Sequence, residues 1–157
     1  MGAATAKQAV DKQQQAFRII GFVHGGIGAI ALLVAAIGVI NTMLMSVLER
    51  TREIGAMRAL GASRKTVRRL FTFEAGTLGL LGGIFGVLIG FVLSLIANPI
   101  VNEQLKKKAL TARDIISVPP LLAVAVIVVT TIIGLLAGLI PAARAARMDP
   151  VDALRAE

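Results

Sequence analysis

The fold class is decided by residues 75–102, which read AGTLGLLGGIFGVLIGFVLSLIANPIVN and contain no Asp, Glu, Lys or Arg. Residues 19–48 and 115–143 lack these four residue types as well. Each stretch exceeds the ~20 apolar residues with which a helix crosses a hydrocarbon core of about 30 Å. The sequence therefore predicts an all-α membrane protein with three transmembrane helices.

The composition of the whole chain agrees with that prediction. Hydrophobic residues make up 56% of the 157 residues, and the mean hydropathy is +0.81. A soluble domain of this size cannot cover so much apolar surface with polar residues. There are no cysteines, so disulfides and thiolate metal sites are excluded.

The chain has a net charge of +8, which indicates that its binding partners are negatively charged. Lys and Arg gather beside the hydrophobic stretches, where they suit anionic lipid headgroups or acidic protein surfaces. No groove-reading motif and no aromatic stacking platform accompanies them, so nucleic acid is not an expected partner.

Three transmembrane spans divide the chain into predicted segments. These are a stalk helix over residues 1–18, spans over about 19–48, 71–97 and 119–141, a charged loop over 49–70, a second loop over 98–118, and a tail over 142–157. Several residue types favour helix ends at these boundaries. In chain order they are Gly61 as a helix C-terminus, Ser63 as an N-cap, Asn98-Pro99 as the end of the second span, Pro119-Pro120 as the start of the third, Pro141 as its end, and Asp149-Pro150 as the start of a tail helix.

The distribution of basic residues predicts the orientation. The 49–70 loop holds seven of them (Arg50, Arg52, Arg58, Arg64, Lys65, Arg68 and Arg69), and the tail on the same side holds three more. The other side has Lys7, Lys12 and Arg18, with four more in the 98–118 loop. Because basic loops stay in the cytoplasm, we expect the charged loop and the C-terminus to be cytoplasmic and the stalk extracytoplasmic.

Glycines recur at fourfold spacing along the second span. Gly82, Gly86 and Gly90 form one stripe, and Gly79 with Gly83 forms an adjacent one. Small residues at this spacing let helix backbones approach closely in lipid, so these five are predicted helix-packing residues. The alternative interpretation is the general enrichment of glycine in membrane helices.

The charged loop contains an amphipathic helical pattern. Ile54, Met57 and Leu60 recur every third residue among charges of both signs. Such a helix suits insertion into a groove on another protein, or it lies in the lipid headgroups as a positive-inside loop. The residue chemistry leaves both interpretations open.

Isolated polar residues favour structural over catalytic roles. Glu74, at the start of the second span, is costly there unless it is interfacial or paired, so we expect an interfacial anchor helped by Arg68, Arg69 or its own helix N-terminus. His24 has no partner ligands in the sequence, so neither a metal site nor acid–base chemistry is expected of it. No G-x-x-x-x-G-K-[ST], G-x-S-x-G or H-E-x-x-H motif occurs, and no catalytic residue is predicted.

One longer motif carries a family resemblance. Residues 38–62, GVINTMLMSVLERTREIGAMRALGA, resemble the signature of the FtsX-like permeases, the MacB-type (type VII) subunits of ABC transporters. Glu74, the glycine stripe and the ending from Pro141 to Arg155 agree with it, and the resemblance covers residues 19–157.

The resemblance implies a mechanism that the residues alone do not. Such subunits have four spans with a large extracytoplasmic domain after the first, and they act as dimers on a pair of ATPase domains. ATP-driven closure of those domains is passed through the cytoplasmic loop to the other side of the membrane, which is called mechanotransmission. The coupling helix that enters the ATPase groove would comprise Arg52, Glu53, Ile54, Met57, Arg58, Leu60 and Gly61.

Partners, cofactors and location follow from the same resemblance. This sequence lacks the first span and the extracytoplasmic domain, so it is similar to the C-terminal part of such a subunit. The implied partners are an ABC ATPase that holds ATP and Mg, a second permease, an extracytoplasmic adaptor and the lipid of the inner or plasma membrane. This chain itself would bind no cofactor. Two alternatives are a cell-division-type regulator that activates an outer cell-wall hydrolase and a lipid-embedded assembly module without transport.

Overall fold

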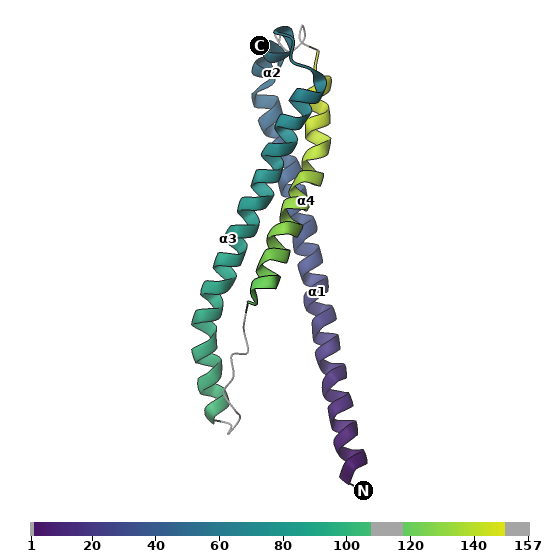
Figure 1. The fold of residues 1–157 in the computed structure, drawn as a ribbon, viewed down its shortest axis with the longest axis vertical. Helices are drawn as coiled ribbons and strands as arrows, with labels where there is room; N and C mark the ends of the chain where they lie inside the picture. The colour runs from purple at the N-terminus through teal and green to yellow at the C-terminus, as the bar shows by residue number, and fades with distance from the viewer. Residues whose placement is uncertain (1, 108–117, 150–157) are drawn as a thin grey trace. The chain divides into compact units, whose positions relative to one another are not determined.

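The computed structural model describes residues 2–107 and 118–149. Within these residues the helices are α1 (Gly2–Glu49), α2 (Thr51–Ala59), α3 (Arg64–Lys107) and α4 (Pro120–Arg147) (Figure 1). Three helical segments are long and apolar enough to cross a membrane, namely Gln14–Glu49, Arg64–Glu103 and Pro120–Arg147. The prediction of an all-α protein with three candidate spans is therefore confirmed. The predictions for Lys108, Arg113 and the tail from Pro150 onward lie outside the described residues.

The chain divides into two compact units. The first unit, Met1–Ala35, contains the N-terminal part of α1 from Gly2 onward. The polar residues of the predicted stalk and the start of the apolar span therefore belong to one helix. The second, Ala36–Glu157, contains the end of α1 together with α2, α3 and α4. A hydrocarbon environment offers no partners for backbone groups, so apolar spans satisfy them internally as helices.

The turn between α2 and α3 follows from two residues. Gly61 has a φ of +97°, a left-handed conformation that glycine adopts without steric cost. The Gly61 and Ala62 amides donate to the Arg58 and Met57 carbonyls at 3.1 and 2.9 Å, which is the Schellman pattern of a helix end. Ser63 then caps α3, because its Oγ accepts the Thr66 amide at 3.1 Å. Both predicted boundary residues are confirmed.

Two predicted helix ends are wrong. Helix α3 continues through Asn98 and Pro99 to Lys107, and α4 continues through Pro141 to Arg147. A proline inside a helix removes one backbone hydrogen bond but does not end the helix when its surroundings hold both sides in register. At Pro141 those surroundings are clear, since Pro141 and the following Ala142 are both buried.

Helices α3 and α4 pack side by side (Figure 1). They approach closely at Gly79 and Gly134, where a Cβ on Gly134 would stand 2.7 Å from the Ala75 carbonyl oxygen. A Cβ on Gly79 would collide with the Thr130 carbonyl oxygen, and one on Gly138 with the Ala75 side chain. The contact therefore exists only because these positions lack side chains.

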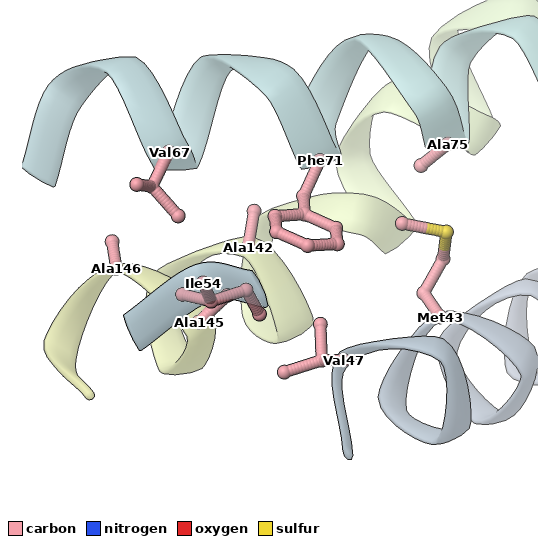
Figure 2. Packing of buried hydrophobic residues seen from close by; sticks show 9 residues of the cluster. All are labelled: Met43, Val47, Ile54, Val67, Phe71, Ala75, Ala142, Ala145 and Ala146. Atoms are coloured by element: carbon pink, nitrogen blue, oxygen red, sulfur yellow. The ribbon is translucent and has the colours of Figure 1, made fainter. Parts of the chain in front are cut away.

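One hydrophobic cluster joins the four helices at the end of unit two where α2 lies (Figure 2). Phe71 of α3 is its largest fully buried side chain. Its members are Met43 and Val47 from α1, Ile54 from α2, Val67, Phe71 and Ala75 from α3, and Ala142, Ala145 and Ala146 from α4. We call this set the junction core.

Candidate functional site

The candidate site is built around α2, whose two sides have different environments. On the inner side, Ile54 is 0% exposed at the centre of the junction core, and Met57 packs against that core (Figure 2 shows Ile54). The hydrophobic effect therefore holds this short helix in place, although nine residues are too few for a stable isolated helix.

Arg58 fixes the same side of α2 to α4. Its guanidinium donates to the Ala146 carbonyl oxygen at 2.9 Å. Ala146 lies in the last turn of α4, where carbonyls lack intrahelical partners and the helix dipole favours a cation. Arg58 is partly buried, so this charge-assisted bond forms out of bulk water.

The outer side of α2 faces away from the rest of the unit. Arg52, Glu53, Ala56 and Leu60 are exposed, and Leu60 is 90% exposed. We call these four residues, together with Gly61, the outer α2 face. Its only large apolar side chain is Leu60, which stands beside the Gly61 turn. An exposed leucine within a charged rim is the arrangement by which a short helix anchors in a groove of a partner.

This geometry divides the predicted coupling residues into two groups. Arg52, Glu53, Leu60 and Gly61 are accessible to a partner, whereas Ile54 is enclosed by its own chain, and Met57 and Arg58 are partly buried. The threefold spacing indicated one common face, but the chain turns at Leu60 and leaves it outside. Ile54 cannot anchor in another protein in this conformation, and its contribution to the site is to position α2.

Glu74 has a partner that the sequence did not indicate. Arg50 Nη1, in the α1–α2 connection, lies 3.3 Å from Glu74 Oε1. We expected Arg68 or Arg69 instead, which precede Glu74 on its own helix. Both side chains of the pair are partly exposed, at 52% and 34%. This ion pair joins the residue between α1 and α2 to α3, next to the junction core.

The predicted helix-packing glycines also fall into two groups. Gly79 and Gly83 are buried against α4, where they face Thr130 and Gly134. Gly82, Gly86 and Gly90 have open space around the position of a Cβ, with nothing within 4 Å. Their role in helix packing stays a prediction. No helix of this unit packs against these three glycines in the described part of the chain.

The described part of the chain holds no cluster of metal-ligating side chains. No three His, Asp or Glu residues there lie close enough to hold a metal ion. His24 Nδ1 lies 2.8 Å from the Ile20 carbonyl oxygen of its own helix, a local interaction within α1.

These features define a class of protein: a polytopic helical membrane protein in which a short charged helix is fixed at one side and exposed at the other. The family follows from comparison with known sequences. The chain belongs to the FtsX-like permeases, because the model of their C-terminal region matches residues 25–150. Members of this family are membrane subunits of ABC transporters, so the chain is an integral membrane protein.

Three relatives illustrate the similarity. The chain is 34% identical over 155 residues to an ABC transporter permease of Methanocaldococcus jannaschii and 40% identical over 150 residues to the permease YvrN of Bacillus subtilis. It is 40% identical over 154 residues to the macrolide export ATP-binding/permease protein MacB of Hyphomonas neptunium. These alignments cover 98%, 96% and 98% of this chain but 37%, 33% and 22% of the relatives. The chain therefore spans a minor part of each relative's length.

Proposed function

We propose that this chain is the part of an ABC transporter permease that receives motion from a cytoplasmic ATPase and passes it into the membrane. The observation that carries the proposal is the two-sided environment of α2. Its inner side is held by Ile54 and Arg58, and its outer side presents Leu60.

The inner contacts supply a route for motion. Packed interiors transmit displacement because they leave no voids to absorb it. The buried side chains around Ile54 come from the other three helices, and Arg58 holds the last turn of α4. A push on α2 therefore moves the ends of α3 and α4 together with it.

The ATPase partner, the dimer and the orientation are proposed for this chain from the properties of its family. ATP and Mg would be held and used by a partner ATPase, and this chain would have no catalytic residue. Two permeases would act as a dimer in the cell membrane, with the outer α2 face in the cytoplasm and the N-terminal end of α1 outside. One relative, MacB of Hyphomonas neptunium, is named a macrolide export protein, which supports export as the direction of transport. A segment outside the membrane, or an adaptor, would receive the motion.

Leu60→Asp tests the proposal. A charge on the outer α2 face should reduce co-purification of the chain with its ABC ATPase in detergent by at least about tenfold, as expected for the loss of an interface anchor. Thermal unfolding of the purified chain should not change, because Leu60 is 90% exposed. Leu60→Met is the matched control and should retain the ATPase. If Leu60→Asp retains it as well, α2 is a packing element only and the proposal is wrong.

A further inference from the structure

A basic hollow lies between the first turns of α3 and the last turns of α4. It has a volume of about 200 Å³ and is lined by Arg64, Lys65, Arg68, Ala143, Ala146 and Arg147. Four of these six residues are cations and none is acidic. Within the described part of the chain, none of the four cations forms an ion pair. We call this feature the basic hollow.

The start of α3 adds to this positive potential. Arg64 and Lys65 are the first residues of α3 after the Ser63 cap, so they lie where the helix dipole is positive. Arg68 follows one turn later on the same side. Guanidinium groups bind phosphate oxygens through paired N–H donors, so the arrangement suits a phosphate group.

A second groove continues from the basic hollow along α4, and its end at Leu139 and Ile140 is apolar. It is lined by Leu139, Ile140, Ala143, Arg144 and Arg147 and has a volume of about 350 Å³. Ala143 and Arg147 line both features. Leu139 and Ile140 lie one turn further into the candidate span. The environment therefore changes from cationic to hydrocarbon-like along one face of one helix.

This order of environments selects the kind of ligand. A free phosphate ion would use the basic hollow alone, whereas a phospholipid would place its phosphate there and an acyl chain on Leu139 and Ile140. The hollow also lies where two candidate spans end, since one begins at Arg64 and the other ends at Arg147. Basic pockets between transmembrane helices at this depth attract anionic headgroups.

We propose that the basic hollow and the adjoining groove bind one anionic glycerophospholipid. Its phosphate contacts Arg64, Lys65, Arg68 and Arg147, and its acyl chain lies on Leu139 and Ile140. The lipid bridges α3 and α4 beside the junction core, because Ala146 belongs to both the core and the hollow. The proposal does not depend on ATPase coupling, since the outer α2 face takes no part in it.

Native mass spectrometry of the delipidated chain in a non-ionic detergent tests this site. The probes are dioleoyl-phosphatidylglycerol and dioleoyl-phosphatidylcholine at equal concentration. One phosphatidylglycerol should be retained with a preference of at least about fivefold. The K65Q/R68Q variant should lose that preference. The R18Q/R69Q variant removes the same charge outside the hollow and should keep it. Equal binding of the two lipids by the unaltered chain, or equal losses in both variants, would overturn the proposal.

Two further measurements separate the sources of the phosphate group. Ala143→Phe fills the space shared by the hollow and the groove without a charge change, so it should reduce phosphatidylglycerol binding as strongly as K65Q/R68Q. Circular dichroism of each variant checks that the helices persist. Inorganic phosphate in excess should not displace the lipid. If it does, or if Ala143→Phe binds the lipid normally with its helices intact, the acyl groove has no role and the assignment to a lipid is wrong.

Discussion

The two glycine stripes of α3 look alike in sequence but have different surroundings in the structure. Gly79 and Gly83, together with Ala75, pack directly against α4. Gly82, Gly86 and Gly90 instead have open space beside them. Helix α2 repeats the contrast, because Ile54 is enclosed and Leu60 is 90% exposed. A helical period shows that a face exists, but it does not show what the face meets.

The largest effect should separate the two sides of α2. Ile54→Asp would place an unpaired charge in the junction core, which we expect to destabilise the folded state by more than about 3 kcal/mol. Leu60→Asp, the same change on the outer side, should stay within about 0.5 kcal/mol. Titration with SDS in mixed micelles, followed by circular dichroism, measures both. Equal effects would mean that Ile54 is not enclosed in the folded protein.

An intermediate effect should separate the two stripes of α3. Gly79→Ala adds a Cβ that meets the Thr130 backbone, so the helices must separate, at a cost of about 1–3 kcal/mol. Gly86→Ala adds the same atom in open space and should be neutral or stabilising by up to about 1 kcal/mol, because alanine favours helix. The same unfolding titration compares them. A large loss in Gly86→Ala would reveal a partner on the open stripe, such as a second copy of the chain.

The smallest effect concerns the contact between Arg50 and Glu74. Both groups are partly exposed, so their coupling should be about 0–1 kcal/mol and should weaken with added salt. A double-mutant cycle with Arg50→Gln and Glu74→Gln isolates this coupling. A coupling above that range that does not depend on salt would show that the pair is shielded from water and contributes to the rigidity of the junction.

The sequence predicted local features well and spatial neighbours poorly. Gly61 and Ser63 gave the turn between α2 and α3 correctly, because capping depends on residues within one turn of each other. Pro141 misled, because the expectation that proline ends a helix ignores packing from other helices, and Pro141 is buried. Pro99 also lies inside a helix, but it is exposed, so packing does not explain why α3 continues there. The partner of Glu74 was also missed, since Arg50 is distant along the chain and no periodicity connects the two.

The basic hollow could be found only in part. Arg64, Lys65 and Arg68 form a visible basic run, but Arg147 joins them only because α4 continues past Pro141 and packs beside α3. The sequence predicts a tail over residues 142–157, which includes Arg147. The groove along Leu139 and Ile140 could not be predicted either, because these residues belong to an apolar span in which no position stands out.

The sequence by itself determined the helical class, the three candidate spans, the turn at Gly61 and the family. These depend on hydrocarbon solubility, local hydrogen bonding and a contiguous motif, all of which act over short distances along the chain. Only the tertiary structure decided which glycine stripe meets α4, that Ile54 faces inward while Leu60 faces outward, and that four cations surround one hollow. Those outcomes depend on which segments become neighbours in space. The composition of a helix does not decide this, because several of its faces are apolar enough to be buried.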